Sequence, residues 1–189
     1  MQVMADPATE QPPLRRRLGV WGWLFALICV GFAVFWVWAL FFASKEAVNK
    51  IGDRAWAARA EGICATAKND MQALHDFRRI DHDSPQLAAM LAERADIVDR
   101  ATDLVEHMLD GVVVVMPTDP KGLALVPQWE ADYRTLIANR REYSDELRQG
   151  HDESFHEAAV DGIPISDKLT RFAGDNYMPS CAAPLDLTN

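Results

Sequence analysis

The chain has 189 residues, of which 49% are hydrophobic and 25% charged, and its formal net charge is −9. The negative charge lies almost wholly after residue 17, because three arginines offset Asp6 and Glu10 before it. Nucleic-acid phosphates and anionic lipid headgroups repel such a domain, so we expect no nucleic-acid binding and favour a basic protein or a cation as electrostatic partner.

Residues 1–17 are polar, contain three prolines and show no hydrophobic periodicity. Segments of this composition cannot bury enough apolar surface to fold. We therefore predict a disordered N-terminus, which is cytoplasmic in the orientation derived below.

Residues 18–44 contain no charged side chain, and the densest apolar run is Trp21–Phe42. As a helix this run is about 33 Å long, which matches the ~30 Å hydrocarbon core of a bilayer. Tryptophans near both ends of the run, such as Trp21 and Trp38, are typical of the two membrane interfaces. The sequence predicts a transmembrane helix in contact with the lipid bilayer.

Two alternatives for this segment are a buried core helix and a cleaved signal peptide. A core helix is seldom uncharged for so long, and a signal peptide has a shorter apolar region. The small residue at its exit, Ala43, follows the bulky Phe41 by two positions, which suits signal peptidase poorly. We expect the segment to remain as a permanent anchor.

Cys64 and Cys181 are the two cysteines outside the apolar run, at opposite ends of the region that follows it. This placement favours one closing disulfide over the alternative of two buried free thiols.

Basic residues flank the apolar run on both sides, so they do not decide its orientation in the membrane. Because disulfides persist in oxidising compartments, we expect residues 45–189 outside the cytoplasm of a cell-membrane protein.

Residues 44–80 lack proline and carry apolar residues at steps of three and four, which predicts that the membrane helix continues as a stalk. A second helix is predicted from Ser84 as N-cap and Pro85 in the first turn. A third is predicted from Pro127 to a stop at Gly150, and a short fourth from Ser166 to Asp175. The third helix places on one face Trp129, Tyr133, Leu136, Arg140, Tyr143 and Leu147.

The predicted fold class is all-α, with one N-terminal transmembrane helix continuing into a three-to-four-helix up-down bundle. The predicted domains are the disordered N-terminus 1–17, the transmembrane helix 18–44 and the extracytoplasmic helical domain 45–189.

Five carboxylates follow one another at helical steps of three and four in the second predicted helix: Asp96, Asp99, Asp103, Glu106 and Asp110. They fall on one stripe, where like charges repel by a few tenths of a kcal/mol per pair. We interpret the stripe as a candidate binding surface for a basic partner. The alternative is a solvated outer face, the commoner role of a charge run.

No pattern for nucleophilic catalysis or phosphate binding occurs, so we expect no enzymatic activity and no cofactor. Glu153 and His156 match half of a di-iron motif, but such sites need a second copy and two further glutamates on facing helices. We therefore predict no metal site and identify no small-molecule substrate.

Several short segments resemble a family of uncharacterised single-pass membrane proteins of actinobacteria. They are Trp56, Ala60-Glu61-Gly62-Ile63-Cys64, Trp129, Arg140-Arg141-Glu142-Tyr143, Phe172-Ala173, Asn176-Tyr177-Met178 and Cys181. The resemblance covers most of residues 45–189 and implies an extracytoplasmic helical domain without a known catalytic role.

These expectations favour a non-enzymatic accessory or scaffolding subunit that docks on membrane-protein partners, such as a respiratory or other cell-envelope assembly. The alternative is an extracytoplasmic ligand-binding or sensor module. A sensor needs a cytoplasmic output, and the short predicted N-terminus supplies none.

Overall fold

The computed structural model describes residues 19–42, 46–74 and 79–187. The chain divides into two units, Met1–Lys45 and Glu46–Asn189, which are treated separately below. The predicted disordered residues 1–17 lie outside the described part of the chain.

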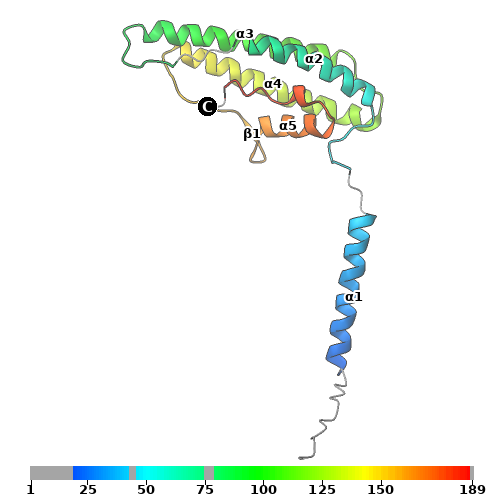
Figure 1. Ribbon diagram of the computed structural model, residues 1–189. Coiled ribbons are helices and arrows are strands. Elements are labelled where there is room, and N and C mark those ends of the chain that lie inside the picture. Colours follow the sequence, from blue (N-terminus) through cyan, green and yellow to red (C-terminus); the bar gives the residue numbers. More distant parts are fainter. Residues whose placement is uncertain (1–18, 43–45, 75–78, 188–189) are drawn as a thin grey trace, which may run out of the picture. The chain divides into compact units, whose positions relative to one another are not determined.

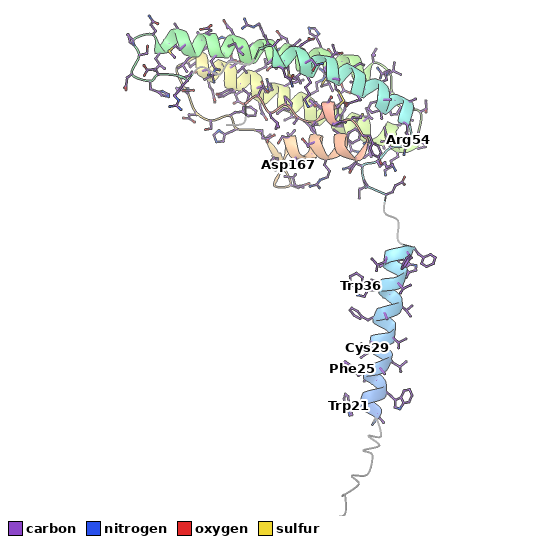
Figure 2. All side chains as sticks on the ribbon, viewed as in Figure 1. Trp21, Phe25, Cys29, Trp36, Arg54 and Asp167 are labelled. Atoms are coloured by element: carbon purple, nitrogen blue, oxygen red, sulfur yellow. A yellow bond between two sulfur atoms is a disulfide. The ribbon has the colours of Figure 1, made fainter. Side chains whose placement is uncertain are left out.

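Helix α1 (Val20–Phe41) is the one helix among the described residues that is long and apolar enough to cross a membrane. None of its residues is buried, and its side chains project outward around the helix, as Trp21, Phe25, Cys29 and Trp36 show in Figure 2. A helix that is hydrophobic all round normally lies in a protein core or in a bilayer. The helix predicted within residues 18–44 is thus confirmed over its described part.

The predicted continuous stalk is wrong. α1 ends at Phe41, residues 46–53 are not helical, and α2 (Arg54–Gln72) begins anew. Asp53 caps α2, because its Oδ1 accepts a hydrogen bond of 2.9 Å from the backbone N–H of Trp56. α2 also ends well before residue 80, so the predicted first helix of the bundle was too long at both ends.

The second unit is a helical bundle in which each helix reverses the direction of the one before, as the up-down prediction required (Figure 1). α3 (Leu87–Val113) packs between α2 and α4 (Pro120–Arg148), and the short α5 (Ile165–Asp175) lies on the opposite side of α4. A 3-10 turn, η1 (Pro179–Cys181), then contacts α2 and α5. The all-α class is confirmed.

Two predicted helix starts were misplaced. Ser84 and Pro85 form a turn, in which Ser84 Oγ accepts from Gln86 N–H at 3.2 Å, and α3 begins at Leu87. α4 begins at Pro120 rather than at Pro127, which lies inside the helix. Its cap is Asp119, whose Oδ2 accepts from Gly122 N–H at 2.7 Å, and a proline directly after such a cap fits the first turn.

Gly122 is required at this start because a Cβ there would lie 2.7 Å from Pro117 Cγ and 2.8 Å from Asp119 Oδ1. Both distances are shorter than a Cβ makes to a non-bonded heavy atom. The tight approach lets the turn between α3 and α4 fold back onto the first turn of α4.

The core fills the space between α2, α3, α4 and α5 with apolar side chains, and the predicted face of α4 supplies its centre. Trp129 packs against Tyr133, with ring centroids 4.9 Å apart, and against Phe172 of α5 at 5.6 Å. Trp56 of α2 adds an edge contact to Trp129. Arg140, on the same face of α4, is 1% exposed.

A two-residue hairpin precedes α5, formed by β1 (Ala159–Val160) and β2 (Ile163–Pro164). α5 begins at Ile165, one residue before the predicted cap Ser166. Ser166 instead donates from its N–H and its Oγ to the carboxylate of Glu157, at 2.8 and 2.6 Å. A carboxylate from the preceding segment thus satisfies the start of α5 in place of a serine cap. The helix ends at Asp175, as predicted.

Candidate functional site

The predicted acidic stripe lies on α3 and faces a matching set of arginines on α4. The arginines are spaced seven residues apart, which places them on one face of α4 because two helical turns span about 7.2 residues. The pairs are Arg148 with Asp96 and Asp99, Arg141 with Asp99, Asp103 and Glu106, and Arg134 with Glu106 and Asp110. We call this set the arginine–carboxylate row.

The basic partner was inferred from repulsion between like charges along the stripe, and arginines of the same chain offset this repulsion. Each of the five carboxylates meets at least one arginine of the same chain. Most of these side chains are partly exposed, and pairs of this kind typically contribute about 0–1 kcal/mol each. The row joins α3 to α4, and its binding to a partner protein stays a prediction.

Asp99 is the most sheltered carboxylate of the row, with a side chain 24% exposed. It accepts a 2.7 Å hydrogen bond from Ser144 Oγ and a 2.5 Å bond from Arg148 Nη2. Partial burial raises the pKa of Asp99, but the hydrogen bonds from Ser144, Arg148 and Arg141 outweigh it and hold the pKa below its ordinary value.

Two further aspartates stabilise the end of the bundle at which α2 and α4 begin. Asp53 accepts from the backbone N–H groups of Trp56 and Thr118, and these bonds lower its pKa. Burial raises the pKa of Asp119, but backbone donors that include Gly122 and Asp53 outweigh it, so that this pKa is also lowered. Each carboxylate therefore stabilises the folded chain most when it is ionised.

Acid should weaken this fold through Asp53, Asp99 and Asp119. Because their pKa values are lower in the folded than in the unfolded chain, their contribution is complete above the ordinary aspartate value near 3.9 and is lost as the pH falls through and below it. We expect a flat melting temperature from pH 7 to about 5 and a fall below about pH 4.5.

The measurement is thermal unfolding of the full chain in detergent, followed by circular dichroism across this pH range. Asp53→Asn should lower the neutral-pH melting temperature and flatten its acid dependence. Asp70→Asn, at an exposed position of α2, is the matched control and should change neither. An acid profile unaltered by Asp53→Asn would contradict the assignment.

The structure contains the predicted disulfide, which joins Cys64 of α2 to Cys181 in η1 across a sequence separation of 117. Both residues are fully buried, whereas Cys29 on α1 is exposed and unpaired. Tyr133 of α4 donates its hydroxyl to the carbonyl of Cys181 at 3.0 Å. The bond fixes the C-terminal segment along the bundle.

That segment places a carboxylate over the buried arginine of α4. Arg140 forms two bonds with Asp186, from Nη1 at 2.8 Å and Nη2 at 2.7 Å, and its Nε donates to Thr102 Oγ1 at 2.9 Å. Asp186 is 20% exposed. Periodicity placed Arg140 on the core face, but its partner lies 46 residues away in an irregular segment without a sequence signal.

The described residues contain no group of three or more His, Cys, Asp or Glu side chains able to hold a metal ion. Glu153 and His156 lie in the irregular segment before the hairpin and are exposed. The predicted absence of a metal and of a cofactor stays a prediction.

A cavity of about 220 Å³ between α4 and α5 was not predicted. Its apolar lining comes from Leu125, Trp129, Ile163 and Phe172, and Lys168 and Arg171 line it from α5. Asp132 pairs with Lys168 at 2.9 Å, whereas Arg171 has no ion pair with a described residue. The indole Nε1 of the buried Trp129 also lacks a hydrogen-bond partner among the described residues.

Lys168 and Arg171, three residues apart, could have been recognised as neighbours on one helix face. What periodicity does not supply is the apposition of α5 and α4, on which the cavity depends. Apolar walls with a few polar groups are typical of small-molecule sites.

Comparison of the chain with protein families, with curated proteins and with solved structures gave no match. The resemblance to actinobacterial single-pass membrane proteins therefore receives no support from these comparisons. The function has to be inferred from the chain itself.

Proposed function

We propose that this chain is a non-enzymatic accessory or scaffolding subunit, anchored in the cell membrane by α1, whose helical bundle docks on membrane-protein partners outside the cytoplasm. The observation that carries the proposal is α1 itself, a 22-residue apolar helix with no buried residue. In water such a helix would expose a large aromatic and aliphatic surface, which a bilayer or a membrane partner covers.

The Cys64–Cys181 disulfide supports the extracytoplasmic location, because such bonds persist in oxidising compartments. Alkaline phosphatase fused after residue 189 should be active, and a fluorescent protein that requires the cytoplasm should be dark at the same position. The opposite pair of results would reverse the orientation and contradict the proposed compartment.

Docking on membrane proteins is tested by purification of the tagged full chain in mild detergent, followed by mass spectrometry. A chimera with α1 replaced by an unrelated apolar helix is the matched control, because it keeps the bundle at the membrane. Partners lost from the chimera bind α1, and partners retained bind the bundle. If neither form enriches a membrane protein over an unrelated single-pass protein, the accessory function is wrong.

The same purification, repeated with Asp99→Asn, Asp103→Asn and Glu106→Gln in one variant, tests the arginine–carboxylate row. Because these carboxylates hold Arg141, the variant needs a melting-temperature measurement beside the purification. Loss of partners at an unchanged melting temperature would support docking through the row. If the variant retains the same partners, the row does not dock a partner and serves only to join α3 to α4.

The cavity between α4 and α5 favours a second candidate function, a ligand-binding module. Its apolar walls, together with Lys168 and Arg171, fit a small organic anion with an aromatic body. Aromatic carboxylates such as benzoate and indole-3-acetate should raise the melting temperature of the full chain, whereas aromatic amines should not. Arg171→Gln should remove the effect; equal responses to both charge types would contradict this candidate.

A further inference from the structure

Exposed hydrophobic side chains of the bundle gather at one end. Eight large hydrophobic residues are exposed among the described residues after 45, and five of them lie on segments that meet at the first turn of α2. These five are Val48, Val114, Val115, Leu123 and Tyr177, and we call the surface they form the apolar end. Arg54, labelled in Figure 2, marks this end of the bundle.

Hydrogen bonds hold two of these segments together. Asn176 accepts from the backbone N–H of Ile51 at 2.8 Å and donates to the carbonyl of Asn49 at 2.9 Å. These bonds bring Val48, which is 83% exposed, near Tyr177, which is 69% exposed. The two backbone segments that carry these exposed side chains are therefore joined to each other.

The turn between α3 and α4 adds the remaining three residues. Val115 accepts a 2.7 Å bond from Trp56 Nε1 and a 3.0 Å bond from Arg59 Nη2 through its carbonyl. Such bonds hold the backbone of Val115 against α2 and leave its side chain 53% exposed. Leu123 follows on the first turns of α4, which Asp119 joins to the backbone of Asp53.

The chemistry of the apolar end differs from that of the bundle as a whole. Residues 46–189 contain fifteen lysines and arginines against twenty-six aspartates and glutamates. At this end Arg54 lies over the ring of Tyr177, 5.6 Å from its centroid, and Asp53 and Asp119 are occupied by backbone N–H groups. Tyrosine, arginine and aliphatic side chains together are typical of the headgroup level of a bilayer.

The connection to α1 is short. Ile51 is 5% exposed and fixes the connecting segment in the bundle. Nine residues lead from Phe42 to Ile51, and such a length of chain spans at most about 30 Å when fully extended. The segment that joins the bundle to α1 thus enters the bundle at the end that carries five of its eight exposed large hydrophobic residues.

We propose that the apolar end rests in the headgroup region of the bilayer that holds α1, so that the bundle contacts the lipid surface through Val48, Val114, Val115, Leu123 and Tyr177. The inference rests on the proposed membrane anchor. Shallow insertion of a few aliphatic and aromatic side chains is sufficient for interfacial contact when a second element already anchors the chain.

The experiment uses the full chain with Cys29→Ser, reconstituted in phosphatidylcholine vesicles without any other protein. A fluorophore is attached at Val48→Cys, at Val115→Cys or, as the control, at Leu185→Cys, which is exposed near the other end of α2 beside Met71 and Gln72. Nitroxide lipids labelled at the headgroup should quench the first two probes at least about twofold more strongly than the control.

A second variant tests the apolar character directly. Val114→Asp with Val115→Asp should reduce quenching of the probe at Val48→Cys to the control level. Val160→Asp with Ile163→Asp, a matched pair of exposed apolar residues on the hairpin, should leave it unchanged. Circular dichroism confirms that each variant is folded.

The outcomes separate this inference from the anchor on which it rests. If the chain floats with the vesicles and all probes are quenched equally, the lipid contact is wrong, the anchor stands, and a protein becomes the occupant to seek. If the chain does not float, the anchor itself is wrong, and the lipid contact with it.

Discussion

Cys64→Ser should lower the free energy of unfolding of the bundle by about 2–5 kcal/mol, the largest loss that we expect from a single substitution. The disulfide spans a sequence separation of 117, so its removal gives the unfolded chain much additional conformational freedom. Cys181→Ser should have the same effect. Denaturant unfolding of the full chain in detergent, followed by far-ultraviolet circular dichroism, measures the difference.

Cys29, which is exposed on α1 and unpaired, is the control position for this experiment. Cys29→Ser should leave the unfolding of the bundle unchanged. Under non-reducing conditions Cys64 and Cys181 should resist alkylation until a reductant is added. Free labelling of both thiols in the native protein would contradict the disulfide and remove the main support for an oxidising compartment.

Asp186→Asn should destabilise the bundle by about 2–3 kcal/mol, since it leaves the positive charge of Arg140 buried without a counter-charge. The loss should be smaller than for a fully buried pair because Asp186 is 20% exposed. Arg140→Met removes the charge itself, so adding Asp186→Asn to it should cost little more. The coupling energy from this double-mutant cycle, measured by denaturant unfolding, reports the pair.

Asp70→Asn is again the matched control, with an aspartate at an exposed site on α2. It should change the unfolding free energy by less than about 0.5 kcal/mol. A coupling energy near zero between Arg140 and Asp186 would show that the C-terminal segment is held by the disulfide and by Tyr133 without the ion pair.

A long uncharged run predicted the apolar helix, and hydrophobic periodicity predicted the helical class and the core face of α4, because all three depend on local sequence. Hydrophobic periodicity gave wrong helix boundaries where capping residues or contacts with distant segments determine them. The stretch after residue 44 reads as uninterrupted helix, but Asp53 caps a new helix and Asn176, from the far end of the chain, binds the backbone before it. Asp119-Pro120 is a good helix start, but the predicted start was Pro127, seven residues later.

For the candidate sites, too, local sequence predicted the features of single helices and missed the contacts between distant segments. Helical spacing correctly placed five carboxylates on one face of α3, and the same spacing relates Arg134, Arg141 and Arg148 on α4. That the two sets face each other follows from the antiparallel packing of α3 and α4, which no local pattern encodes. The cavity between α4 and α5 and the bond from Arg140 to Asp186 depend in the same way on contacts between distant segments.

The disulfide also determines how the bundle would carry mechanical load. A pull applied between residue 46 and the C-terminus passes along the covalent chain to Cys64, crosses to Cys181 and continues into the tail. Residues 65–180, which include α3, α4 and α5, lie outside this path. Tension along this path would unravel only residues 46–63 and the residues after 181, while the helices between the two cysteines stay unloaded.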